Sequence, residues 1–147
     1  SFGVAGSHGK TTTTGMLSTM LQNVQSTGYL IGDGTGHIEK DSKCFVVEAD
    51  EFRRHFLAYH PDYAIITNAD LDHVDYFKSE EDYYLAYEQF SAQVKKAVVM
   101  FGDDEKVRNL KVNTTHYYYG VEDGNDFQAI NIDEIYGHVP RRGLRGF

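Results

Sequence analysis

Residues 3–14, GVAGSHGKTTTT, combine the residue types that phosphate binding requires. Gly6 and Gly9 lack a Cβ, so the backbone there can adopt a positive φ and approach a ligand closely. Lys10 adds a compact cation, and the hydroxyl of Thr11 suits a hard metal ion. If a helix begins near Lys10, its first N–H groups and its dipole favour an anion at that end. The stretch therefore predicts a phosphate-binding loop.

The match to the standard phosphate-loop pattern is incomplete. That pattern, G-x-x-x-x-G-K-[ST], requires a glycine where this chain has Val4; what stands here is G-x-x-G-K-T with a further glycine at Gly3. A glycine turn before an ordinary helix is the alternative. The apolar lead-in, the glycine pair and the helical pattern after Lys10 favour the phosphate loop.

Two further apolar stretches end on residues that could hold metal ions. CFVVEADE carries Glu48 at its end, and AIITNADLDHVD carries Asn68 and His73. Ligands of parallel sheets bind at the carboxyl ends of the strands, where a hydroxyl, a carboxylate and an imidazole could hold divalent ions beside phosphates. Alternatively, Glu48 could end its strand in solvent, and His73 could cap a turn. Other acids nearby are more often solvated loop residues than ligands: Asp50, Glu51, Asp70 and Asp75.

The stretch EFRRHFL is a cation cluster in an acidic protein. It contains Arg53, Arg54 and His55 in succession. A solvated helix face is one explanation. The other is a seat for a phosphate or carboxylate group of the substrate.

Apolar runs alternating with helical patterns predict the elements that must position these residues. Strands are expected in SFGVA, GYLIG, CFVVEA, DYAIITN, AVVMFG, THYYYG and FQAINI, and helices over residues 12–24, after the N-cap Ser79, and in DDEKVRNLK. Residues 32–36 are too rich in glycine for regular structure. Near-continuous apolar strands between helices indicate an α/β fold of the P-loop type, with a doubly wound, mainly parallel sheet and helices on both faces.

Composition limits the class of protein. The chain has 147 residues, a net charge of −8 and 41% hydrophobic residues, which fits one globular domain. The negative charge disfavours a nucleic-acid surface, and we find neither a membrane-spanning apolar run nor a signal peptide. Cys44 is the only cysteine, so a disulfide within the chain is excluded and a cytoplasmic location fits.

Four motifs, in this order and spacing, resemble the central ATP-binding domain of the Mur ligases in the form typical of Gram-positive bacteria. They are GVAGSHGKTTTTGM, LIGDGTG, VVEADEFRRHFL and AIITNADLDHVDYF, and the resemblance runs over residues 2–132. His8, the threonine run and EFRRHFL favour the alanine-adding member of the family. A relative that recycles ready-made peptides shares some of these features.

The resemblance implies a reaction in peptidoglycan precursor synthesis. ATP phosphorylates the carboxylate of UDP-N-acetylmuramate, and the amine of L-alanine attacks the acyl phosphate. The implied nucleotide contacts are Gly6, Ser7, His8, Gly9, Lys10, Thr11 and Thr12. By the same resemblance, Thr11 and Glu48 would hold one Mg²⁺ and His73 would help to hold a second. The implied catalytic residues are Lys10, Glu48 and His73. The implied substrate contacts are Asn68, Arg53, Arg54 and His55.

The resemblance also implies a domain organisation. Residues 1–132 correspond to the ATP-binding domain, incomplete at its C-terminal end because we find no G-x-H-N-x-x-N segment, and residues 133–147 form a tail of uncertain origin. The UDP-binding and amino-acid-binding domains of the family are absent, so we expect a domain excised from a longer enzyme. The alternatives are a peptide-recycling ligase, a ligase like folylpolyglutamate synthase, and a nucleotide-binding module without catalysis.

Overall fold

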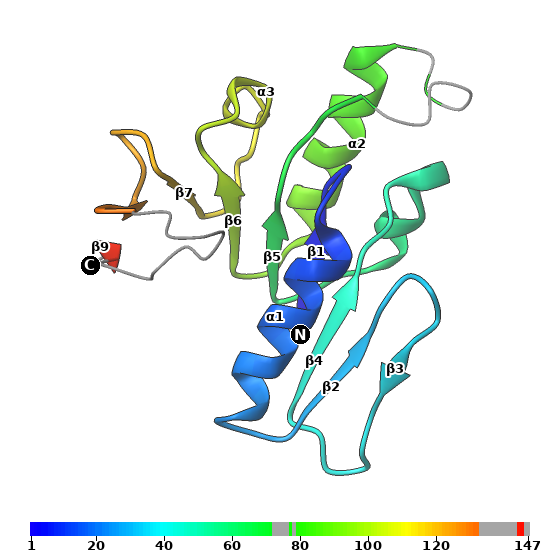
Figure 1. Cartoon of the computed structure of the whole chain (residues 1–147). Helices are drawn as coiled ribbons and strands as arrows, with labels where there is room; N and C mark the ends of the chain where they lie inside the picture. The colour runs from blue at the N-terminus through cyan, green and yellow to red at the C-terminus, as the bar shows by residue number, and fades with distance from the viewer. Residues whose placement is uncertain (72–76, 78, 133–143, 146–147) are drawn as a thin grey trace.

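The computed structural model describes residues 1–71, 77, 79–132 and 144–145 and shows a sheet flanked by helices (Figure 1). The strands are β1 (Phe2–Ala5), β2 (Thr27–Leu30), β3 (Gly36–His37), β4 (Cys44–Glu48), β5 (Tyr63–Ile66), β6 (Ala97–Phe101), β7 (His116–Gly120), β8 (Phe127–Ala129) and β9 (Leu144–Arg145). They form one sheet in the order β3-β2-β4-β1-β5-β6-β7-β8-β9. The apolar runs CFVVE and AVVMF supply two of the inner strands, β4 and β6.

The sheet is mainly parallel, as the sequence predicts. β1 lies between β4 and β5 and is parallel to both. Only the pairs β2–β3 and β8–β9 are antiparallel among the described strands. The strand order reverses direction around β1, so the loops after β1, β4 and β5 meet at one edge of the sheet.

Two strands lie where we expected none. The prediction that residues 32–36 hold no regular structure is wrong at Gly36, which begins β3. Gly34, with φ of 88°, turns the chain, and Ile31 N donates to Thr35 O at 2.8 Å, which closes a hairpin. β9 lies within the expected tail and pairs with β8.

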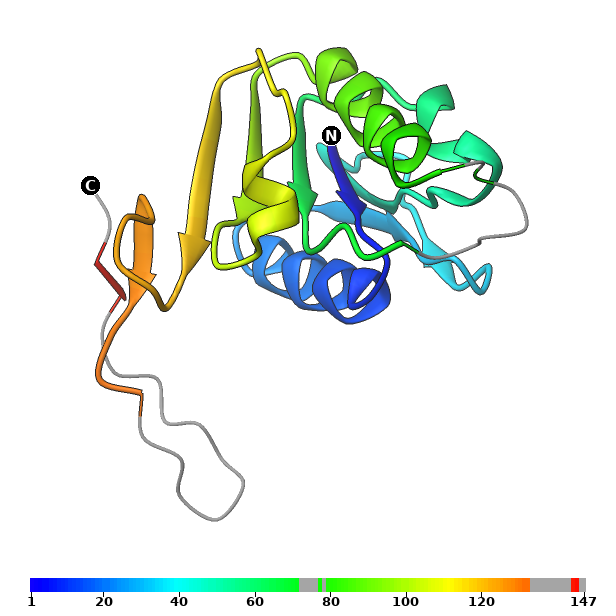
Figure 2. The same ribbon diagram turned by 90° about the horizontal axis from the view of Figure 1, so that it is seen from above.

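Helices cover both faces of the sheet, which confirms the predicted fold class. The helical elements are α1 (Lys10–Gln22), η1 (Phe52–Ala58, a 3₁₀ segment), α2 (Glu80–Gln93) and α3 (Glu105–Arg108). Figure 2 shows α1 on one face and α2 on the other. Ser79 is the N-cap of α2, as predicted, and its side chain accepts a hydrogen bond from Asp82 N at 3.2 Å.

The core on the α2 side is aromatic. Phe56 of η1 stacks on Phe90 with ring centroids 4.9 Å apart, and its ring meets that of Tyr87 edge-on at 5.4 Å. Phe56, Tyr83, Tyr87 and Phe90 are all fully buried. This packing fixes α2 and η1 against the sheet. It also places the hydroxyl groups of two buried tyrosines close to the loop that follows β1.

The helix α1 packs on the sheet with small side chains. Thr14 and Ser18 are its buried residues, whereas Met16 and Met20 are 56% and 62% exposed. The helix therefore lies against the sheet along its hydroxyl-bearing face. Among the described residues, no helix combines the length and apolar character needed to cross a membrane.

Candidate nucleotide-binding site

The loop between β1 and α1 depends on Gly6. Its φ is 141°, and a Cβ at this position would overlap the hydroxyl oxygen of Thr67. That hydroxyl donates to His8 O at 2.7 Å. A larger residue at position 6 would therefore push the loop away from the strand that supports it.

The N-terminus of α1 is suited to an anion. The N-cap is Gly9, with φ of 79°, and within the described residues α1 has neither a side-chain cap nor an acid in its first turn. By contrast, α2 is capped by Ser79 and carries three acids in its first turn, and α3 is capped by Asp104. The N–H groups and the positive end of the α1 dipole are thus left for an external acceptor.

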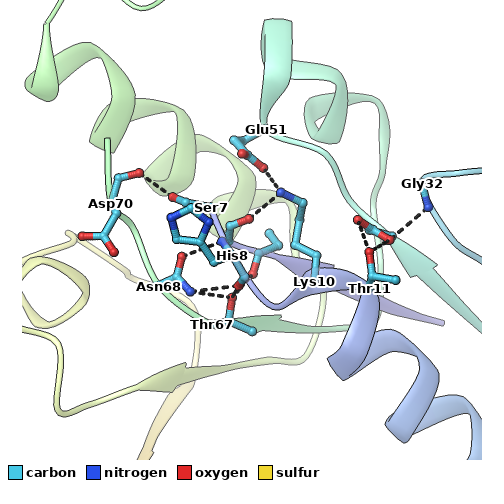
Figure 3. A network of polar contacts seen from close by, with 12 residues as sticks. Ser7, His8, Lys10, Thr11, Gly32, Glu51, Thr67, Asn68 and Asp70 are labelled. Atoms are coloured by element: carbon cyan, nitrogen blue, oxygen red, sulfur yellow. Dashed lines mark hydrogen bonds and ion pairs between the residues drawn. The ribbon is translucent and has the colours of Figure 1, made fainter. Parts of the chain in front are cut away.

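Lys10 places its cation over this loop (Figure 3). Its ammonium group donates to Gly6 O at 2.7 Å and lies 2.8 Å from Glu51 Oε2. The Lys10 side chain is 13% exposed and that of Glu51 is fully buried. The cation is therefore held beside the phosphate loop and does not extend into solvent.

Thr11 and Glu48 form the oxygen pair that the sequence predicts. The Thr11 hydroxyl donates to both Glu48 oxygens, at 3.0 and 3.2 Å, and Glu48 Oε2 also accepts from Gly32 N at 2.9 Å. Glu48 thus bonds to the first turn of α1 and to the loop after β2, and it does not simply end its strand in solvent. A hydroxyl and a carboxylate that face each other are hard oxygen ligands, so these residues fit Mg²⁺.

The third predicted metal ligand, His73, lies outside the described residues, as do Asp72 and Asp75. Within the described part of the chain, no group of three or more His, Cys, Asp or Glu residues is arranged to hold a metal ion. Of the three predicted metal ligands, the structure therefore describes only Thr11 and Glu48.

The side chains of Asn68 and Ser7 fix the loop by hydrogen bonds to other parts of the protein. The Asn68 amide accepts from His8 N and donates to His8 O, both at 2.9 Å. The Ser7 hydroxyl donates to Asp70 O at 2.5 Å and lies 2.6 Å from the hydroxyl of Tyr83. Both side chains are engaged within the protein. The backbone N–H of His8 is likewise taken by Asn68, whereas the His8 side chain is exposed.

The cation cluster does not act as one group. The Arg54 guanidinium donates to Asp82 Oδ1 at 2.5 Å and to Gln89 Oε1 at 2.9 Å, which ties η1 to α2. Arg53 and His55 are exposed. Arg53 and Arg54 both adopt left-handed backbone conformations, with φ of 50° and 59°. Such strain in residues other than glycine is frequent at functional sites.

A cavity of about 260 Å³ lies beside the oxygen pair. Its lining residues are Leu30, Ile31, Gly32, Gly34, Glu48, Asp50, His55 and Tyr59. His55 from the cation cluster and the glycine-rich loop therefore share one cavity with Glu48. This cavity joins two of the four sequence motifs next to the phosphate loop.

Sequence reasoning missed two residues of the site. Glu51, expected to be a solvated loop acid, is fully buried beside Lys10. Tyr83, which the sequence did not single out for the site, is buried on α2 and its hydroxyl lies 2.6 Å from that of Ser7. The pattern EADE gives no signal that separates Glu51 from Asp50. Only the fold brings Glu51 against Lys10.

The first strand of this parallel sheet leads through a glycine loop into a helix that begins with Lys and Thr. This arrangement defines a nucleotide-binding domain of the P-loop type. Residues 4–139 match the family model described as Mur ligase middle domain. The chain belongs to this family, which confirms the resemblance carried by the four motifs.

Relatives and solved structures agree with this assignment. The chain is 59% identical over 132 residues to UDP-N-acetylmuramate–L-alanine ligase of Lactiplantibacillus plantarum and 53% identical over 132 residues to that of Streptococcus equi subsp. zooepidemicus. These alignments cover 90% of this chain and 30% of each relative. The chain thus spans about a third of the length of these relatives.

The fold is shared with more distant ligases of known structure. UDP-N-acetylmuramate:L-alanyl-gamma-D-glutamyl-meso-diaminopimelate ligase from Neisseria meningitides superimposes with a TM-score of 0.75 at 24% identity, over 94% of this chain and 52% of that one. MurF from Acinetobacter baumannii gives 0.71 at 20% identity, over 90% and 33%. E. coli FolC in complex with DHPP and ADP gives 0.58 at 14% identity, over 86% and 43%. These similarities concern the fold.

Proposed function

We propose that this chain binds ATP with Mg²⁺ as part of a ligase that joins L-alanine to UDP-N-acetylmuramate through an acyl phosphate, in peptidoglycan precursor synthesis in the cytoplasm. The names of relatives at 52–60% identity support these substrates. The observation that carries the proposal is the uncapped start of α1, with the Lys10 cation on one side and the Thr11–Glu48 oxygen pair on the other.

The roles follow from the positions of these groups. Lys10 and the N–H groups of the loop other than that of His8, which donates to Asn68, would hold the β- and γ-phosphates. Phosphoryl transfer depends mainly on such positioning and charge neutralisation. Thr11 and Glu48 would hold Mg²⁺, which supplies positive charge to the phosphate oxygens. In this proposal Lys10, Glu48 and His73 are the catalytic residues, and His73 assists a second metal ion.

We propose that the acceptor carboxylate enters the cavity beside Glu48, next to the metal ion that the oxygen pair would hold. The lining of this cavity includes Glu48 of the oxygen pair and His55 of the cation cluster. We assign the carboxylate of UDP-N-acetylmuramate to this cavity, and Arg53, two residues before His55, is kept as a further substrate contact in this proposal. Asn68 and Arg54 would act indirectly, because Asn68 bonds to the loop and Arg54 bonds to α2.

A segment exchange tests the proposal. The segment of the Lactiplantibacillus plantarum ligase that aligns with this chain is replaced by the chain itself, and phosphate release is measured with ATP and Mg²⁺. We expect release that requires both UDP-N-acetylmuramate and L-alanine, and its loss in the same chimera carrying Glu48→Gln. A chimera that is folded by circular dichroism and binds UDP-N-acetylmuramate, yet makes no product, would contradict the proposed function.

A further inference from the structure

Glu51 is a charged residue that the proposed roles leave without a task. It lies three residues beyond Glu48, at the start of η1, and its side chain is fully buried. Its Oε2 atom lies 2.8 Å from the ammonium group of Lys10. A buried carboxylate is costly to maintain unless it is paired and hydrogen-bonded. The fold therefore places the Glu51 carboxylate next to the Lys10 ammonium group, which compensates its buried charge.

The ammonium group of Lys10 has three donors and two of them are directed by the protein. One donates to Gly6 O at 2.7 Å and one to Glu51 Oε2. The lysine side chain is long and flexible, so its cation has no fixed position of its own. Two acceptors fix it, and the third donor would be available to a phosphate oxygen at the start of α1.

Glu51 lies close to a buried tyrosine of α2. The pKa of Tyr87 lies well above its ordinary value because its ring is buried and, to a smaller extent, because the charge of Glu51 is close. The Tyr87 hydroxyl lies 3.1 Å from that of Tyr83, which contacts Ser7 of the loop at 2.6 Å. The same face of α2 thus borders Glu51 and bonds to the loop.

We propose that Glu51 is a positioning residue that fixes the Lys10 ammonium beside the phosphate loop and acts on a bound nucleotide only through Lys10. The proposal rests on the proposed function for its effect on ATP. Its structural part, the hold on Lys10, can be tested without a nucleotide. A merely repulsive carboxylate would have the opposite effect on ATP, because its removal would strengthen the binding of an anion.

The first measurement is the acetylation rate of each lysine. The 147-residue chain is treated with a small acetylating reagent, and mass spectrometry follows each lysine separately. In Glu51→Gln, we expect Lys10 to react severalfold faster than in the wild type. Lys106, which bonds to the exposed Asp70 at 2.8 Å, is the internal reference and should be unchanged. Glu39→Gln, an exposed acid paired with His37, is the matched control and should leave both rates unchanged.

The second measurement is calorimetric titration with ATP–Mg²⁺. Glu51→Gln should weaken binding by about tenfold, the loss expected for one hydrogen bond to a charged group. In a double-mutant cycle, Lys10→Met should cost less affinity in the Glu51→Gln background than in the wild type, because Glu51 acts through Lys10. Equal losses in both backgrounds, or tighter binding by Glu51→Gln alone, would overturn the positioning role.

The two measurements distinguish a failure of the proposed function from a failure of the positioning role of Glu51. If the wild-type chain binds no ATP–Mg²⁺, the proposed function fails, while the acetylation rates still decide whether Glu51 holds Lys10. An unchanged Lys10 rate in Glu51→Gln overturns that hold. If Glu51→Gln does not fold, Glu51→Asp replaces it. Aspartate keeps the negative charge, but its side chain is one methylene shorter, so the carboxylate lies further from the Lys10 ammonium group. A Lys10 rate in Glu51→Asp identical to the wild type would equally overturn the proposal.

Discussion

Lys10 contributes to stability as well as to the site. Its ammonium group faces a fully buried carboxylate, Glu51, at 2.8 Å. We expect Lys10→Ala to lower the free energy of unfolding by about 3 kcal/mol, because removal of one partner leaves a buried charge uncompensated. Lys10→Ala combined with Glu51→Gln should recover part of this loss. Thermal unfolding of the three variants checks the prediction.

Lys106→Ala is the control for Lys10→Ala. Lys106 pairs with Asp70 at 2.8 Å, but both side chains are about half exposed, at 44% and 52%. Exposed ion pairs contribute little to stability, so this variant should melt close to the wild type. If Lys10→Ala also melts like the wild type, the buried pair does not carry the stability assigned to it.

Much of the site could be predicted from residue types. Strands that end on Glu48 and on the glycine loop must meet at one edge of a parallel sheet, and Thr11 does lie within hydrogen-bond distance of Glu48. Glu51 could not be identified in this way. Its sequence neighbourhood is that of a loop acid, and its burial arises from the packing of η1 against α2. His73 remains a prediction, because it lies outside the described residues.

At the scale of elements, the hydrogen bond between Tyr83 of α2 and Ser7 of the phosphate loop should make a measurable contribution to the free energy of unfolding. Tyr83→Phe removes the hydroxyl that lies 2.6 Å from Ser7 and 3.1 Å from Tyr87, while the buried ring is kept. We expect a loss of about 1 kcal/mol, which corresponds to a fall in Tm of about 2–4 °C for a chain of this size. Tyr84→Phe, one residue further along α2, removes a hydroxyl outside this chain of bonds and is the control. Equal melting temperatures for the two variants would contradict the link.

The elements themselves were largely predictable, for a physical reason. Strands in a sheet covered on both faces need continuous apolar runs, which are visible in the sequence. The start of α2 is marked by the N-cap Ser79 and three acids in the first turn. The hairpin at β3 was not predictable in the same way. Its strand is only two residues long, and its formation depends on pairing with β2.

At the scale of the whole molecule, carboxylates should make the fold sensitive to acid. The pKa of Asp103 is lowered: burial opposes this shift, but hydrogen bonds from Val121 N, the Asn125 amide and Glu122 N outweigh it. Hydrogen bonds likewise lower the pKa of Asp70, through Lys106, and that of Asp33, through Thr35. A carboxyl whose pKa is lower in the folded state stabilises the fold above its unfolded pKa of about 4 and loses this effect as the pH falls below it.

Thermal unfolding as a function of pH tests this expectation. Tm should fall as the pH is lowered below about 4. Asp103→Asn should melt lower than the wild type at neutral pH and show a smaller further decrease in acid, because one titrating group has been removed. An acid dependence of Asp103→Asn as steep as that of the wild type would show that Asp103 does not contribute.

The central claim is that the start of α1, with Lys10, Thr11 and Glu48, forms a site for ATP and Mg²⁺. The most direct test is calorimetric titration of the 147-residue chain with ATP, with and without Mg²⁺, beside Glu48→Gln. We predict saturable binding at one site that Mg²⁺ strengthens by about tenfold or more, a gain expected of a metal that bridges protein and phosphate oxygens. Glu48→Gln should lose most of this gain and recover part of it at higher Mg²⁺ concentration, by mass action. Absence of saturable binding, or the same Mg²⁺ dependence in both proteins, would contradict the claim.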